Sequence, residues 1–293
     1  MSAPEAVPLR FHEDAEFFRE AVSFTAAETG FAARLIEEDY CCTALLQYLA
    51  SGSPALVFKG GTCLAKVHSG FYRMSEDLDF LLPARTSASR PERRRHAAPT
   101  RAAVARLGEQ LSGLELAAPL QGANDCSQYA AAITYRSHFG SPQESIWIEI
   151  GLREPLLSDA VAGSAHTLAL DPVSGSTLVP PIQVPCLSRR EAMAEKLRAA
   201  LTRRVVAIRD FNDVDHAVRH AGLQVLEPEL LALVRRKLAV PGNEPADVSP
   251  ARLAALKPQL EAQLRPVLRD RDFAAFDLKR AFQTVTAVAA ALG

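Results

Sequence analysis

The chain has 293 residues, a formal net charge of −1 and 48% hydrophobic residues. This length predicts two domains, or one domain with a large appendage. The near-neutral charge excludes an overall attraction to nucleic acid, so any such binding needs a local basic patch. We expect no membrane segment, because no apolar run reaches the ~20 residues of a membrane helix and the N-terminus does not resemble a signal peptide.

The five cysteines are scattered along the sequence and show no C-x-x-C spacing. This pattern indicates reduced thiols in the cytoplasm, and neither a disulfide framework nor a zinc site.

The N-terminal part of the chain is predicted to begin with helices. Apolar residues recur at helical spacing, Asp14 can cap the first helix, and Gly30 can end it. The elements predicted in this part are helices over 12–50, interrupted at Gly30, and 62–71, and short buried strands over 55–58 and 78–82.

Residues 83–99 are predicted to form an exposed loop, because they are rich in proline, serine and arginine and have no periodicity. Alternating segments after this loop predict paired, mostly antiparallel strands. The elements expected here are a helix over 100–113 and strands over 128–137, 144–154 and 166–171.

The C-terminal third has a helical pattern, with predicted helices over 188–221, 227–239, 249–268 and 273–291. The proline cluster at 178–187 predicts the boundary between two domains. We therefore expect a helical lead and a mixed core over residues 1–178, and a helical domain over residues 179–293. The expected fold class is α+β with a mixed sheet.

Two carboxylates stand one residue apart at the mouth of a predicted strand. Because side chains alternate along a strand, Asp77 and Asp79 are expected on one face and Leu78 and Phe80 on the other, in the core. Such a pair can hold Mg²⁺ together with substrate phosphates, and two metals about 4 Å apart would clamp both oxygens of a phosphoryl transfer. The alternative is a solvated Asp-x-Asp motif without function.

Two further features favour a functional site that binds phosphate and metal. The turn Gly60-Gly61-Thr62 lies between a predicted strand and a predicted helix, where backbone N–H groups can approach a phosphate; alternatively, the turn is structural. Glu149 lies between two isoleucines and is predicted to point inward, so it needs a partner. A metal shared with the Asp-x-Asp pair would serve, and so would an arginine.

The first helix of the C-terminal third is basic and begins with a capping box, Ser188 with Glu191. Lys196, Arg203 and Asp210 are spaced by seven, so they share one face if the helix is continuous. This face could present a cation to a triphosphate and a carboxylate to a hydroxyl or a second cation. The alternative is a solvated basic face with ordinary ion pairs.

Two blocks of the sequence carry a family resemblance. They are Lys59-Gly60-Gly61-Thr62-Cys63-Leu64 with Arg73-Met74-Ser75-Glu76-Asp77-Leu78-Asp79, and Lys196-Leu197-Arg198-Ala199 with Arg203 and Arg209-Asp210-Phe211-Asn212-Asp213. Together they resemble the AbiEii/AbiGii toxin family, MenT-like nucleotidyltransferases of the DNA polymerase beta-like superfamily. The similarity covers roughly residues 17–285. Fourteen residues separate Thr62 from Asp77, more than is usual in the broader superfamily, which favours the narrower family.

The resemblance implies a polymerase beta-like nucleotidyltransferase core with a helical C-terminal domain. It also implies a role for each matching residue. Metal binding falls to Asp77, Asp79 and, as the candidate third carboxylate, Glu149. Nucleotide binding falls to Lys59, Gly60, Gly61, Thr62, Arg73, Ser75 and Lys196. Catalytic roles fall to Asp77, Asp79 and Lys196, with Asp210 or Asp213 completing the site.

The implied reaction is transfer of a nucleoside monophosphate from an NTP to an acceptor hydroxyl, with Mg²⁺ or Mn²⁺ as cofactor. The expected acceptor is the 3′ end of tRNA, whose modification would block translation in toxin–antitoxin or phage-abortive systems. Basic residues at 90–96 could contact the RNA backbone, or form a solvated segment. The alternatives are nucleotidylation of a protein, modification of a small molecule, and a binding module whose catalytic site has decayed. The expected partners are NTP, tRNA and an antitoxin, a winged-helix regulator that does not stably bind the toxin.

Overall fold

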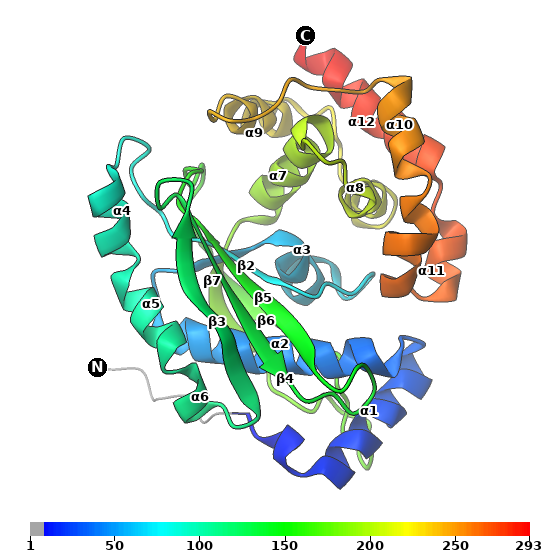
Figure 1. Cartoon of the computed structure of the whole chain (residues 1–293). Coiled ribbons are helices and arrows are strands. Elements are labelled where there is room, and N and C mark those ends of the chain that lie inside the picture. The colour runs from blue at the N-terminus through cyan, green and yellow to red at the C-terminus, as the bar shows by residue number, and fades with distance from the viewer. Residues whose placement is uncertain (1–8) are drawn as a thin grey trace. The chain divides into compact units, whose positions relative to one another are not determined.

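In the computed structural model of the protein, which describes residues 9–293, the chain divides into two compact units. The first unit contains the chain up to Leu156 together with Ala160–Leu187, and the second contains Leu157–Asp159 and Ser188–Gly293. The first unit combines helices with a mixed sheet, whereas the second is helical (Figure 1). The predicted α+β fold class is therefore confirmed. Among residues 9–293, every helix is too short or too polar to span a lipid bilayer.

Two long helices follow a short 3₁₀ turn, η1 (Phe11–Glu13), at the start of the first unit. Helix α1 (Ala15–Thr29) begins at Asp14, whose side chain accepts two backbone N–H groups, and ends at Gly30 in the left-handed conformation. Helix α2 (Ala33–Gly52) is buried at every residue from Leu35 to Leu46. A helix that is buried on all sides lies in the interior, and α2 passes across the sheet in Figure 1.

Seven strands form one mixed sheet in the order β3-β4-β5-β2-β1-β7-β6. The β1–β7 and β2–β5 pairs are parallel, and the other pairs are antiparallel. The strands are β1 (Val57–Lys59), β2 (Leu78–Leu81), β3 (Leu114–Ala123), β4 (Gln128–Tyr135), β5 (Glu144–Gly151), β6 (Val161–Ala165) and β7 (Ile182–Cys186).

Three of these strands differ from the sequence prediction. Strand β3 was missed because it contains alanines and Pro119; the proline is tolerated because β3 is an edge strand. Strand β7 lies inside the proline cluster that was predicted to be only a boundary. The strand expected at 166–171 is wrong, since β6 lies just before it and Leu170 makes only an isolated bridge.

The region predicted as an exposed loop over 83–99 contains helix. Helix α4 (Arg90–His96) begins with a capping box between Ser89 and Glu92, and this local signal outweighs the lack of apolar periodicity. The single helix expected over 100–113 is replaced by two, α5 (Ala98–Ala105) and α6 (Leu107–Gln110).

The helix after β1 changes its winding along its length. It starts as α3 (Gly60–Cys63) and continues as a π-helix, η2 (Leu64–Ser69), where the predicted helix was 62–71. Most π-helical turns occur as short insertions in α-helices, and they are frequent at functional sites.

The second unit is a bundle of helices. The single helix predicted over 188–221 is wrong: it is broken at residues 203–207, where Arg203 is extended and two valines lower the helix propensity. The predicted helices 249–268 and 273–291 are likewise interrupted. The helices are α7 (Arg189–Thr202), α8 (Ile208–Ala221), α9 (Pro228–Leu238), α10 (Pro250–Leu256), η3 (Leu260–Leu264), η4 (Arg265–Val267), α11 (Asp270–Ala275) and α12 (Leu278–Leu292).

A buried lysine and an aromatic stack hold this bundle together. Lys237 Nζ lies 2.8 Å from Glu191 Oε1 and 2.9 Å from Glu195 Oε1, so α9 is fixed to α7 by charge-assisted hydrogen bonds. The rings of Phe211 and Phe282 are stacked with centroids 5.8 Å apart, which joins α8 to α12.

Candidate active site

Three neighbouring strands of the first unit bring charged residues together on one face of the sheet. Lys59 on β1 is the aligned partner of Asp79 on β2, and Asp79 is the aligned partner of Glu149 on β5. Aligned residues on neighbouring strands point to the same face with Cβ atoms roughly 5 Å apart. One lysine and two carboxylates therefore lie in a row across β1, β2 and β5, which we call the carboxylate row.

The predicted inward orientation of Glu149 is wrong. Ile148 and Ile150 are fully buried, whereas Glu149 between them is exposed. Strand alternation places an acid between two core residues on the opposite face, and this face is the one that carries Asp79. Glu149 therefore still lies beside the Asp-x-Asp motif, but it needs no partner inside the core.

Asp77 precedes β2 and adds a further negative charge next to the row. Burial, followed by the negative charges of Asp79, Glu76 and Glu149, raises the pKa of Asp77 to about 6. Carboxylates that repel one another in this way are relieved by a bound cation. Several carboxylate oxygens form the hard ligand set that Mg²⁺ and Mn²⁺ prefer, so these residues fit the divalent cation that the resemblance implies.

The glycine turn after β1 packs directly against the carboxylate row. Gly60 has φ +78°, and a Cβ atom there would come within 2.8 Å of the Asp79 side chain. At Gly61, a Cβ atom would lie 2.6 Å from Arg73 Nη2 and 2.8 Å from Ser75 Oγ. Gly60 therefore requires glycine for its backbone conformation and for the close approach of Asp79, whereas a side chain at Gly61 would displace the ends of Arg73 and Ser75.

Thr62 and Arg73 support the turn from within the protein. Each is only 2% exposed. The Thr62 hydroxyl donates a short hydrogen bond to the Asp77 carbonyl, and Arg73 Nη1 donates to the Met74 carbonyl at 2.9 Å. These contacts position the glycine turn and the segment that carries Asp77. Direct contact of the two side chains with a nucleotide stays a prediction from the resemblance.

Helix α2 contributes a buried acid, Glu38, that was not predicted from the sequence as a site residue. Arg34 lies 3.0 Å from Glu38 and 3.2 Å from Glu76. Burial, followed by the negative charge of Glu76, raises the pKa of Glu38 to about 8. The charge of Asp77 adds to this rise, and the positive charge of Arg34 opposes it. The signal in the sequence is the acidic run at 37–39 inside an otherwise apolar helix.

A buried ion pair fixes the helix that follows the glycine turn. Lys66 Nζ donates to Asp39 Oδ1 at 2.5 Å and to Thr43 Oγ1 at 2.6 Å. The other carboxylate oxygen of Asp39 accepts from Thr167 Oγ1 and from the Leu168 N–H, both at 2.9 Å. No local pattern predicts this network, because its members lie on segments that are far apart in the sequence.

In the second unit, Lys196 lies between two buried carboxylates. Its Nζ is 3.0 Å from Asp210 Oδ1 and 2.8 Å from Asp213 Oδ2, and Arg203 Nη1 is 3.3 Å from Asp210 Oδ2. The predicted continuous helical face is wrong, since Lys196 is on α7 and the two acids are on α8. The turn between these helices brings the residues together, and both acids hold the same ammonium group.

Comparison with known proteins then decides the family. The model of the AbiEii nucleotidyl transferase toxin family, described as a type IV toxin–antitoxin system, matches residues 44–288. The chain belongs to the AbiEii family. The match includes both sequence blocks, and the predicted resemblance to nucleotidyltransferase toxins is confirmed.

Two solved structures have a similar fold. The AbiEii chain is similar to MenT4, a nucleotidyltransferase toxin from Mycobacterium tuberculosis H37Rv, with a TM-score of 0.59 and 21% identity over 94% of this chain and 98% of MenT4. It is also similar to JHP933 from Helicobacter pylori, with a TM-score of 0.52 and 15% identity over 89% of this chain and 93% of that one. At such identities the likeness concerns the fold. A comparison with curated proteins gave no match.

Proposed function

We propose that this AbiEii-family protein is a Mg²⁺-dependent nucleotidyltransferase that adds a nucleoside monophosphate to the 3′ end of tRNA and so blocks translation. The observation that carries the proposal is the carboxylate row beside the glycine turn. Asp79 and Glu149 are aligned on neighbouring strands, Asp77 lies close enough to repel them, and Gly60 packs against Asp79. This combination suits a cation and a phosphate at the same place.

The proposed transfer exchanges one P–O bond for another. The acceptor hydroxyl oxygen attacks the α-phosphorus of the NTP, a new P–O bond forms, and the bond to the oxygen that bridges to the β-phosphate breaks. Pyrophosphate leaves, and a nearby carboxylate accepts the hydroxyl proton. Asp77, Asp79 and Glu149 would hold a divalent cation, which would supply neutralisation of the negative charge that develops during the transfer.

The chain's own residues orient the triphosphate. The glycine turn lets phosphate oxygens approach backbone N–H groups without a side chain in the way. We assign Lys59 and Ser75, which are both half-buried, to the phosphates, as the first sequence block implies. We assign Lys196 to the same role from the second block, with Asp210 and Asp213 holding its ammonium group.

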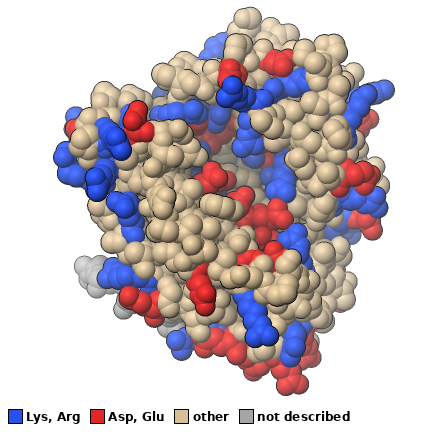
Figure 2. Space-filling model, in the orientation of Figure 1, with Lys and Arg blue, Asp and Glu red and all other residues tan. Residues whose placement is uncertain are grey.

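A basic pocket in the first unit supports RNA as the acceptor. Arg90, Arg94 and Arg101 line a pocket of about 290 Å³ together with Tyr129. Lys and Arg side chains gather over α4 in Figure 2. Arginines bind phosphates through planar, bidentate hydrogen bonds, and contacts with the backbone position a nucleic acid independently of its sequence. We therefore place a contact with the tRNA backbone at this pocket.

The family description also bears on regulation. A type IV toxin–antitoxin system implies an antitoxin, and we propose that the partner is a winged-helix regulator that counteracts the toxin without a stable complex.

A transfer assay tests the proposal. The protein is incubated with total tRNA, Mg²⁺ and each α-labelled NTP in turn, beside Asp79→Asn and the exposed control Asp159→Asn. We expect label at the 3′ end of tRNA with wild type and Asp159→Asn, and none with Asp79→Asn. Label on a protein would replace tRNA by a protein acceptor, and label on a small molecule would indicate a small-molecule transferase. No label with any of the four NTPs would favour a decayed binding module.

A further inference from the structure

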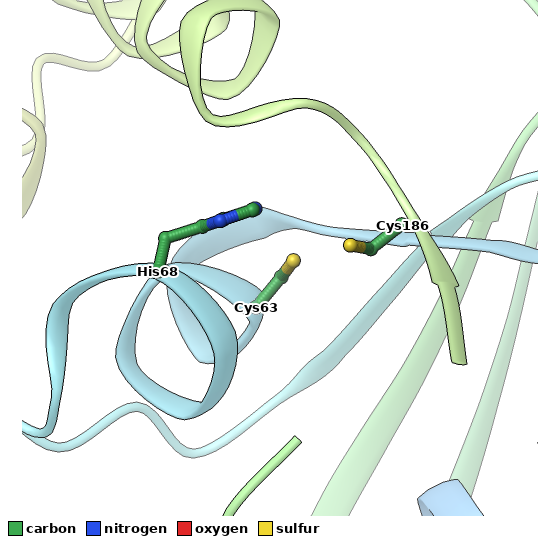
Figure 3. A group of neighbouring side chains, drawn as sticks. All are labelled: Cys63, His68 and Cys186. Carbon is green, nitrogen blue, oxygen red and sulfur yellow. The ribbon is translucent and has the colours of Figure 1, made fainter. Parts of the chain in front are cut away.

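The proposed reaction leaves a cluster of two cysteines and one histidine unused. The Sγ atoms of Cys63 and Cys186 and a ring nitrogen of His68 all lie within 4.8 Å of one another. Both cysteines are 0% exposed, whereas His68 is half-buried. Figure 3 shows the three side chains converging from separate parts of the first unit: the helix after the glycine turn and the end of β7.

The π-helix explains how two of these residues meet. Cys63 ends α3, and His68 lies five positions later in η2. In an α-helix, with 3.6 residues per turn, residues five apart are about 140° apart around the axis. The wider π-helical turn returns His68 to the side of Cys63. The change from α-helix to π-helix therefore brings the Cys63 thiol and the His68 imidazole together.

A hydrogen bond to the main chain selects one tautomer of the imidazole. His68 Nε2 lies 2.9 Å from the carbonyl oxygen of Leu187. A carbonyl can only accept, so Nε2 carries the proton and Nδ1 keeps its lone pair. Histidines that bind metals almost always donate their other N–H to a carbonyl or carboxylate in this way.

The neighbouring strand leaves room for one of the sulfur atoms. A Cβ atom on Gly163 of β6 would lie 2.6 Å from Cys186 Sγ and 2.8 Å from Val67 Cγ1. Any larger residue at this position would displace the sulfur or the Val67 side chain. The cluster is thus shaped by β6, β7 and η2, and it does not depend on the chance proximity of flexible surface groups.

We propose that Cys63, His68 and Cys186 bind one Zn²⁺ ion, with water as the fourth ligand on the half-buried histidine side. Two thiolates and a neutral imidazole are donors that zinc prefers. Tetrahedral Zn–S bonds of about 2.3 Å bring two sulfurs to roughly 3.8 Å, a separation that needs only small movements within this cluster. Zinc binds the thiolate form of both cysteines, so the affinity rises with pH until both thiols are ionised.

Zinc at this place would hold the glycine turn. Cys63 follows Thr62, whose hydroxyl binds the Asp77 carbonyl, so the ion would tie this segment to the end of β7. The cysteines lack C-x-x-C spacing, so the sequence alone predicts no zinc site. The donors meet only in the folded chain, on elements that are far apart in the sequence.

Cobalt substitution tests the proposal directly. Reduced, metal-free protein is titrated with Co²⁺ in excess Mg²⁺, which occupies oxygen sites such as the carboxylate row. We expect a thiolate-to-cobalt charge-transfer band, displacement by one Zn²⁺ per chain, and a loss of affinity of about 100-fold or more in Cys63→Ser and Cys186→Ser. Cys42→Ser, which changes a buried cysteine of α2, is the matched control and should bind as wild type does.

A second measurement keeps the test valid if a cysteine variant fails to fold. Because Cys63 and Cys186 are buried, a reagent alkylates them only when the cluster opens, and mass spectrometry follows this slow reaction. In wild type, Zn²⁺ should slow it further and leave the half-buried Cys126 unaffected. The proposal is wrong if reduced wild type binds no stoichiometric zinc, if Cys186→Ser binds Co²⁺ as tightly as wild type, or if neither thiol is protected. A Cys63–Cys186 disulfide whose reduced form takes up no zinc would make the cluster a redox pair instead.

Discussion

Replacing Asp77 by asparagine should stabilise the metal-free protein above about pH 6. Asp77 has a pKa of about 6 in the folded protein, against an ordinary value of 3.8. Between these values the folded state binds more protons than the unfolded chain, so stability falls as the pH rises from about 4 to about 6 and stays lower above. Asparagine removes this charge and keeps an oxygen that can accept the backbone N–H of Trp147.

The size of the effect follows from the same pKa. A rise from 3.8 to about 6 corresponds to about 3 kcal/mol of unfolding free energy. Asp77 is only half-buried, and water screens part of this repulsion, so we expect a gain of about 1–2 kcal/mol. Divalent cations should stabilise wild type by relieving the same repulsion, and they should stabilise Asp77→Asn less.

Urea unfolding of wild type, Asp77→Asn and the exposed control Asp159→Asn measures this difference. The three proteins are compared at a series of pH values from about 4.5 to 8, without metal and with Mg²⁺. Burial of Glu38 gives every variant a further fall in stability with pH, so the informative quantity is the difference from wild type. If Asp77→Asn were less stable than wild type at neutral pH, or gained as much from Mg²⁺, the carboxylate row would not be a site of repulsion relieved by a cation.

Four other changes test neighbouring parts of the account. Gly60→Ala should destabilise the protein by about 1–3 kcal/mol in urea unfolding and abolish transfer, because of its positive φ and the contact with Asp79; equal stability and activity would contradict the assigned turn. Lys66→Met should cost about 3–5 kcal/mol by leaving the buried Asp39 carboxylate without its cation, and an unchanged unfolding midpoint would speak against the ion pair. Glu38→Gln should remove about 2–4 kcal/mol of the stability lost between about pH 4.5 and pH 8, since burial raises the pKa of Glu38 to about 8; an unaltered pH profile would show that this carboxyl does not stay protonated. Arg94→Ala should weaken tRNA binding and lower the slope of log K against log salt by about 1, and an unchanged slope would place the RNA elsewhere.

Local patterns in the sequence predicted the parts of the fold that depend on local chemistry. The Asp14 cap and Gly30 C-cap set the bounds of α1, and apolar runs ended by glycine or proline marked β1 and β2. Strand alternation predicted that Asp77 and Asp79 would share a face. The same rule, applied consistently, would have put Glu149 on that face too, because its isoleucine neighbours are the core residues.

Other features depend on contacts between distant segments and carry no local signal. Strand β7 lies within a proline-rich segment, and it is ordered by pairing with β6 and β1. The break between α7 and α8 moves Lys196 and Asp210 onto different helices, and a hairpin replaces the expected helical face. Lys66 and Asp39 form a buried pair only because η2 packs on α2.

The central claim is that the carboxylate row performs the nucleotidyl transfer. The most direct test is the initial rate of α-phosphate label transfer at saturating Mg²⁺ and NTP, compared among wild type, Asp79→Asn and Asp159→Asn, all shown to be folded. We expect wild type and Asp159→Asn to agree, and the rate of Asp79→Asn to fall by at least about 100-fold, since one lost ligand disables the cation on which the electrostatic stabilisation depends. A rate for folded Asp79→Asn within about twofold of wild type would show that the reaction takes place elsewhere.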